Sequence, residues 1–192
     1  MAEKNFNKLS SYVLSKYLIS TYSERSEFTR NLIVESLRNT DKRLINGQSI
    51  TPGFLIAALL WPGLIERSLS KGEINLRKFF MSMDYVLRNQ QKITAVPRKF
   101  QSYIKDIWVL QLKLHSRIGK QPYKTLKHPR FRAAYDLLLL RERATNKKQD
   151  LGKWWTDFQK NDENIKKALI NDLKEKNMQE TPKIFGFSEE LR

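Results

Sequence analysis

The sequence predicts an all-α protein, a multi-helix array of about eight helices. Apolar residues recur at intervals of three and four along most of the chain, which is the spacing of one face of an α-helix. The chain has 7 glycines and 6 prolines in 192 residues, so long elements are favoured over many turns. The alternation of apolar and polar residues that is typical of half-buried strands does not occur.

The first expected helices precede the most basic part of the chain. Residues 5–22 and 28–45 each carry one apolar stripe. A short apolar helix begins at Pro52 and is expected to stop near Pro62, because proline interrupts a helix interior. Residues 74–92 form the next amphipathic segment. These ranges predict four helices.

The remaining expected helices follow Pro97. The longest begins there and closes at Gly119. Residues 128–144 are apolar on more than one side, which predicts a buried helix. After a linker at 145–150 comes a tryptophan-rich helix, in which one of two adjacent tryptophans is expected in the core and the other at its edge. A charged helix over roughly 162–177 completes the array.

Composition excludes several classes of protein. There is no cysteine, which rules out a disulfide scaffold and thiolate metal sites and fits a reducing cytoplasm, the expected location. The N-terminus has no continuous apolar stretch of the kind found in secretory signals. The longest uncharged run, residues 47–65, is divided by two prolines and falls short of the ~20 residues that span a bilayer. We therefore expect no membrane association.

The basic residues are concentrated in one part of the chain. The formal charge is +16, and residues 88–132 contain twelve basic residues against Asp106 alone. Such a field favours a polyanionic partner, above all a nucleic acid. Tyr123 and Phe131 interleave with the cations and could stack on bases. The candidate phosphate-binding residues are Arg98, Lys99, Lys105, Lys113, Arg117, Lys120, Lys124, Lys127, Arg130 and Arg132.

Two other interpretations compete for the basic tract. On a helical wheel, the cations of the longest helix share an arc of about 120°, which also fits an ordinary solvated face, and this alternative stays open. A helix lying on a membrane surface is the main competitor, but the broad aromatic face indicates a core helix.

Other polar residues point to structural roles. His115 is expected to line the wall of the core, and His128 to cap the helix that follows it. Asp136 is spaced to hold Arg132 or Arg143 on the same helix edge. The sequence contains no metal-ligand spacing and no phosphate-binding or nucleophile motif, so we expect no catalytic residue and no metal in this chain.

Several longer blocks form a pattern along the chain: ITPGFLIAALLWPGL (50–64), AVPRKF with IKDIWVLQLKL (95–114), KHPRFRAAYDLLLLRERA (127–144), NTDKRL (39–44) and KWW-x-x-F (153–158). Together these blocks resemble bacterial poly(A) polymerases. They occur in the order that is found in the C-terminal half of that family. The family belongs to the nucleotidyltransferases that include the CCA-adding enzymes.

The resemblance implies a division of the chain. Members join a catalytic head to a helical neck, body and leg, which would place part of the neck at 1–48, the body with its basic RNA-facing helix at 49–145, and the leg and tail at 146–192. The array would resemble the body and leg of class II nucleotidyltransferases. The head's paired aspartates have no counterpart here, so ATP and Mg²⁺ are implied only for a head outside this chain.

The function implied is RNA binding in polyadenylation, a step of RNA processing. The chain would hold single-stranded 3′ regions of RNA, with weak sequence preference, while a head adds AMP. Two alternatives stay open: a stand-alone basic RNA-binding module, which could dock a separate head, and a helical scaffold that binds an acidic protein.

Overall fold

The computed structural model describes residues 27–69, 76–145 and 150–177. Within these ranges it contains eight α-helices and no β-strand, which confirms the all-α prediction. The helix expected at 5–22 lies outside the described residues. The helices are α2 (Glu27–Ile45), α3 (Pro52–Leu69), α4 (Leu76–Ile93), α5 (Arg98–His115), α6 (Gln121–Leu126), α7 (Phe131–Ala144), α8 (Leu151–Lys160) and α9 (Glu163–Asn177).

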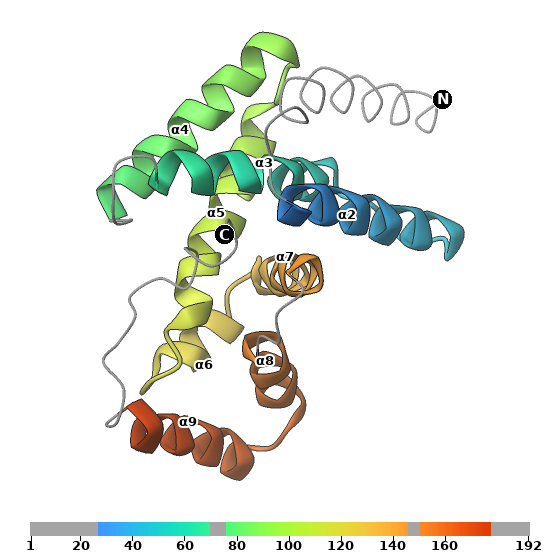
Figure 1. Ribbon diagram of the computed structural model, residues 1–192. Helices are drawn as coiled ribbons and strands as arrows, with labels where there is room; N and C mark the ends of the chain where they lie inside the picture. Colours follow the sequence, from blue (N-terminus) through green and yellow to red (C-terminus); the bar gives the residue numbers. More distant parts are fainter. Residues whose placement is uncertain (1–26, 70–75, 146–149, 178–192) are drawn as a thin grey trace.

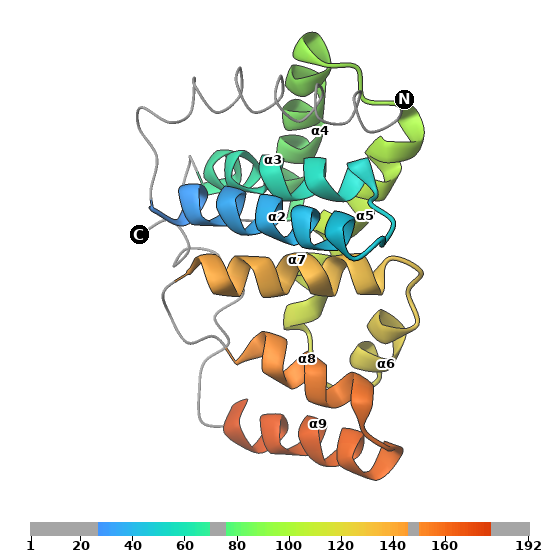
Figure 2. The ribbon, with the colours of Figure 1, turned by 90° about the vertical axis from the view of Figure 1, so that its right-hand side faces the viewer.

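The helices form a stack that α5 connects along its length. Figures 1 and 2 show α2 and α3 near one end, followed by α7, α8 and α9, while α4 lies at the end opposite α9. Helix α2 packs against α3 and α7, α3 packs against α4, and α8 packs against α7 and α9. Helix α5 contacts α3, α6 and α7. The short α6 therefore lies beside the part of α5 that is farthest from α4.

The expectation that the apolar helix ends near Pro62 was wrong. Helix α3 continues to Leu69 with Pro62 inside it. An interior proline costs about 3 kcal/mol, but burying one large apolar side chain contributes about 1.5–3 kcal/mol. Trp61, Leu64 and Ile65 flank the proline and are fully buried. Their packing holds the helix together across the interruption.

The longest expected helix is shorter than predicted. Helix α5 ends at His115, and the chain turns at Gly119, which has a φ of 63° that favours glycine. Helix α6 follows, with Pro122 in its first turn, and was not predicted. His128 does not cap α7, because α7 begins at Phe131, but its Nδ1 accepts a hydrogen bond from the backbone N–H of Arg130 at 3.1 Å.

Two apolar clusters share α5 and α7. The first packs α2, α3 and α4 against these helices, and the second packs α8 and α9 against them. Trp155 is 0% exposed and Trp154 is 7% exposed, so the expectation of one tryptophan at the core edge was wrong. The indole N–H of Trp155 donates to the carbonyl of Leu114 at 2.9 Å, which ties α8 to the end of α5.

A buried polar contact lies where the two clusters meet. Arg141 is 2% exposed and donates through a terminal nitrogen to Oε1 of Gln111 at 2.7 Å. Gln111 is 0% exposed and donates to the carbonyl of Ala134 at 2.9 Å. The Arg141 guanidinium also lies over the ring of Trp61, 4.5 Å from its centroid. This junction joins α3, α5 and α7, a role that the sequence did not suggest for Arg141.

We predict that Arg141 and Gln111 are energetically coupled. Removing either partner takes away a hydrogen bond of the other at a buried site, so Gln111→Leu and Arg141→Met should each lower the free energy of unfolding by about 2–4 kcal/mol. The double variant should fall short of the sum by about 1–3 kcal/mol. Urea unfolding followed by circular dichroism measures all three. Arg143→Met, the same change at an exposed site on α7, should stay within about 0.5 kcal/mol of the parent. Strict additivity would contradict the coupling.

We also predict that His115 makes the fold sensitive to mild acid. Burial, and then the charges of Arg141 and Arg117, lower the pKa of His115 from 6.5 to about 3. Below pH 6.5 the imidazole is protonated in the unfolded chain but stays neutral in the folded chain, so the free energy of unfolding decreases as the pH falls. The decrease due to His115 amounts to about 2 kcal/mol between pH 7 and pH 5.

The measurement is denaturant unfolding as a function of pH. His115→Gln should flatten the profile between pH 7 and pH 5, whereas His128→Gln, which leaves His115 in place, should keep the decline. The same slope in the parent and in His115→Gln would show that other groups cause it.

Candidate nucleic-acid interface

Three of the predicted cations line one groove between α6 and α9. The groove has a volume of about 680 Å³, and we call it the lysine groove. Helix α6 and the residues that flank it contribute Lys120, Lys124 and Lys127, and α9 contributes Lys167. The complete lining is Gly119, Lys120, Tyr123, Lys124, Lys127, Glu163, Lys167, Ile170 and Asn171. Four ammonium groups thus border a hollow whose lining includes the apolar surface of Tyr123 and Ile170.

The local sequence explains why these lysines share a side of α6. They are four and three residues apart, which is the spacing of one helix face. Pro122 and Thr125 are buried on the other side of the helix. Tyr123 lies between the two sides and packs edge-on against Phe158 of α8, with ring centroids 5.3 Å apart. The packed side of α6 therefore fixes the direction in which its lysines point.

Glu163 connects the α9 side of the groove to α6. Its Oε1 accepts a hydrogen bond from Nζ of Lys166 at 3.0 Å, and this contact lowers the pKa of Glu163, which stays ionised at neutral pH. The carboxylate also lies beside the phenol of Tyr123. Burial, and then the negative charge of Glu163, raise the pKa of Tyr123. Lys167 had no signal in the sequence, because α9 mixes acids and bases and only the packing of α9 against α8 brings this lysine near α6.

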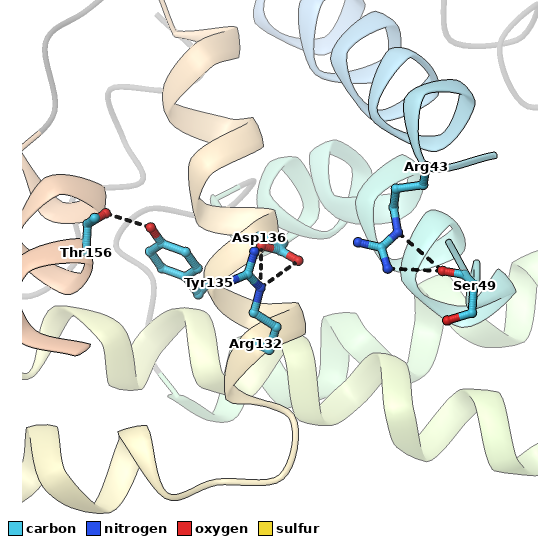
Figure 3. Close-up of polar contacts among 6 residues, drawn as sticks. All are labelled: Arg43, Ser49, Arg132, Tyr135, Asp136 and Thr156. Carbon is cyan, nitrogen blue, oxygen red and sulfur yellow. Dashed lines mark hydrogen bonds and ion pairs between the residues drawn. The ribbon is translucent and has the colours of Figure 1, made fainter. Parts of the chain in front are cut away.

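Arg130 and Arg132 belong to a second group, the arginine cluster. Its members are Arg43, Arg130, Arg132 and Arg143. Nε of Arg132 lies 3.1 Å from Oδ1 of Asp136, which confirms the expectation that this carboxylate holds an arginine (Figure 3). Burial raises the pKa of Asp136, while the positive charges of Arg132, Arg43 and Arg143 act in the opposite direction.

Arg43 comes from the C-terminal end of α2, a region that the prediction did not include. It donates to the carbonyl of Ser49 from Nε at 3.3 Å and from a terminal nitrogen at 3.0 Å (Figure 3). Arg130 lies over the ring of Tyr103, 4.9 Å from its centroid. A backbone carbonyl and a ring thus position two of the four guanidinium groups.

The lysine groove and the arginine cluster adjoin each other. Lys127 and Arg130 are three residues apart, so their Cα atoms lie within about 10 Å. We call the two together the cationic strip.

The predicted cations of α5 are more dispersed. Lys105 forms an ion pair with Asp84 of α4 at 2.6 Å, and together with Lys113 it borders a pocket of about 250 Å³ that Asp84 and Asp106 also line. Arg117 is partly buried with its guanidinium 5.5 Å from the ring centroid of Trp154, and burial lowers its pKa. Arg98 and Lys99 are exposed on the first turn. This face is less cationic than the wheel suggested, because α4 supplies a carboxylate.

The two interleaved aromatic residues have different surroundings. Phe131 is buried, stacked on Tyr135 and in contact with Trp155, so it presents no surface for a base. Tyr123 lines the lysine groove.

The described residues contain no group of three or more His, Cys, Asp or Glu side chains that could hold a metal ion. No described helix combines the length and the apolar character that a membrane span requires.

Comparison with known proteins agrees with the resemblance seen in the sequence. Residues 71–184 match the family described as polymerase A arginine-rich C-terminus. Poly(A) polymerase I of Salmonella typhi is 33% identical over 183 residues, which cover 88% of this chain and 39% of that protein. The enzyme of the same name from Escherichia coli O6:H1 is 36% identical over 161 residues, 80% of this chain and 35% of its own length. That of Haemophilus influenzae is 34% identical over 179 residues, 88% and 40% respectively.

The chain thus spans about two fifths of the length of the curated relatives that it matches. The family match covers more than half of this chain, and these bacterial relatives align with most of it. The chain belongs to the polymerase A arginine-rich C-terminus family and is a homologue of poly(A) polymerase I.

Proposed function

We propose that this chain is the RNA-binding helical portion of a poly(A) polymerase. It would hold the 3′ region of a single-stranded RNA while a catalytic head adds AMP to its end. The observation that carries the proposal is the cationic strip, in which α9 contributes a lysine to the groove beside α6 and α2 contributes Arg43 to the cluster on α7, although α2 and α9 are far from these helices in the sequence. The names of the relatives supply the reaction, and the strip supplies a surface for its polyanionic substrate.

The chemistry of the strip suits the phosphate backbone. Lysine and arginine side chains neutralise phosphates and release counterions, a contribution that does not depend on sequence. An enzyme that extends many different RNA ends benefits from such a grip. We therefore expect most of the affinity to come from phosphate contacts.

Adenylyl transfer itself would belong to the head. ATP and Mg²⁺ would bind there, because the described residues of this chain do not group the carboxylates that such a metal needs. The role of this chain is to bind and orient RNA. We place that role in the cytoplasm.

We predict that the lysine groove sets the salt dependence of RNA binding. Changing Lys120, Lys124 and Lys127 together to Gln removes three cations from exposed positions, so the fold should persist. The slope of log K against log salt concentration should decrease by about 0.7 for each phosphate that the variant no longer neutralises. Filter binding of a single-stranded RNA at several salt concentrations measures the slope.

A matched control changes Arg77, Arg88 and Lys92 to Gln. These exposed cations lie on α4, at the end of the molecule opposite α9 (Figure 1). The net charge changes equally, and the salt slope should remain close to that of the parent. Equal reductions of the slope in both triple variants would mean that binding follows total charge and not the strip. RNA binding that is absent at low salt would favour the protein scaffold.

A further prediction concerns activity. With ATP, Mg²⁺ and an RNA primer, the purified chain should leave the primer length unchanged, because it contributes binding only. Adding the catalytic part of a homologous polymerase should give primer extension, which the lysine-groove triple variant should reduce. Gel analysis of labelled primer measures both. Extension by the chain alone would contradict the proposal.

A further inference from the structure

We infer that the lysine groove also selects the base it receives, placing an exocyclic amino group against Glu163 and so disfavouring uracil. This inference rests on the proposed function, since the ligand is a nucleotide within a bound RNA strand. Phosphate contacts alone would give no preference among bases, and Glu163 would add one.

The groove has room for more than a backbone phosphate. Its volume of about 680 Å³ falls within the ~300–1,000 Å³ of typical small-molecule sites. Tyr123 and Ile170 give the lining an apolar part, which suits the plane of a base, while the lysines border the hollow. A nucleotide would thus find phosphate partners and an apolar surface in the same place.

Glu163 is the feature that a site for phosphate alone would not contain. Among the described residues it is the only acidic one in the lining, and its negative charge repels phosphates. Its side chain is 63% exposed and stays ionised, so it can only accept hydrogen bonds. A carboxylate has about four lone-pair sites, and the contacts with Lys166 and Tyr123 leave capacity for a donor from the ligand.

The edges of the bases differ in what they offer to this carboxylate. Adenine and cytosine carry an exocyclic amino group beside an unprotonated ring nitrogen, and guanine carries one beside a ring N–H; each amino group can donate to a carboxylate. Uracil has no amino group, and its one ring N–H is flanked by two carbonyl oxygens, which Glu163 would repel. Asn171 lines the same groove and has both a donor and an acceptor. The amide can therefore pair with the ring nitrogen next to the amino group.

A purely structural role for Glu163 makes a different prediction. If the carboxylate serves only to hold Lys166 and Tyr123, its removal loosens α9 and weakens binding of every RNA by the same factor. Selection changes the ratio of affinities for different bases. The ratio therefore separates the two roles.

The test compares the unmodified chain with oligo(C) and oligo(U) of equal length at one salt concentration. These strands have the same backbone and ring size and differ only at the base edge, where cytosine has an amino group beside an unprotonated nitrogen and uracil has a carbonyl beside an N–H. We expect oligo(C) to bind about tenfold more tightly than oligo(U), since one well-placed contact is worth about 1–3 kcal/mol of discrimination. Oligo(A) should likewise exceed oligo(I), in which a carbonyl replaces the amino group of adenine.

Glu163→Gln should bring the ratio of oligo(C) to oligo(U) affinities close to one, because the amide offers a donor to the carbonyl of uracil. Asp106→Asn removes an exposed carboxylate on α5 and should keep the ratio of the parent. Equal affinities for oligo(C) and oligo(U) in the parent would overturn the selection and leave the proposed function standing. No binding of any strand at low salt would overturn both.

Discussion

The contact between Arg141 and Gln111 determines where the cationic strip can lie. It joins α5 to α7, and α6 is the only helix between them along the chain. Helix α6 has six residues, far fewer than the ~12–15 that a marginally stable isolated helix needs. Its position therefore depends on the two helices that flank it. The contact between Arg141 and Gln111 thus positions the lysines of α6 and the arginines at the start of α7, although none of these residues takes part in it.

Burying the guanidinium of Arg141 costs desolvation free energy, and its contacts offset that cost. Gln111 accepts one of its hydrogen bonds, and the face of Trp61 provides a cation–π contact at 4.5 Å. An apolar pair has no directional contact and could slide along the helix axis. The directional hydrogen bond between Arg141 and Gln111 fixes the register of α5 against α7. It thereby also fixes the distance between these helices that the segment containing α6 must span.

Features that depend on the local sequence pattern could be predicted, whereas features that depend on packing between helices could not. Periodicity located α2, α4, α5, α8 and α9 closely, and the spacing of Arg132 and Asp136 predicted their ion pair. Local rules failed at Pro62, where burial outweighs the cost of a helical proline. The roles of Arg43 and Lys167 had no local signal, because each reaches its cluster only through packing of α2 or α9.

The positions of the acidic residues determine which basic residues remain available to a polyanion. Asp84 pairs with Lys105, Asp136 with Arg132 and Glu163 with Lys166, so each carboxylate offsets the charge of one cation. Within the described part of the chain, no acid forms an ion pair with Lys120, Lys124 or Lys127. A helical wheel counts the cations of one helix but does not show which carboxylates the neighbouring helices supply. The surface that remains for a polyanion is consequently shorter than the basic tract of the sequence, and it is centred on α6.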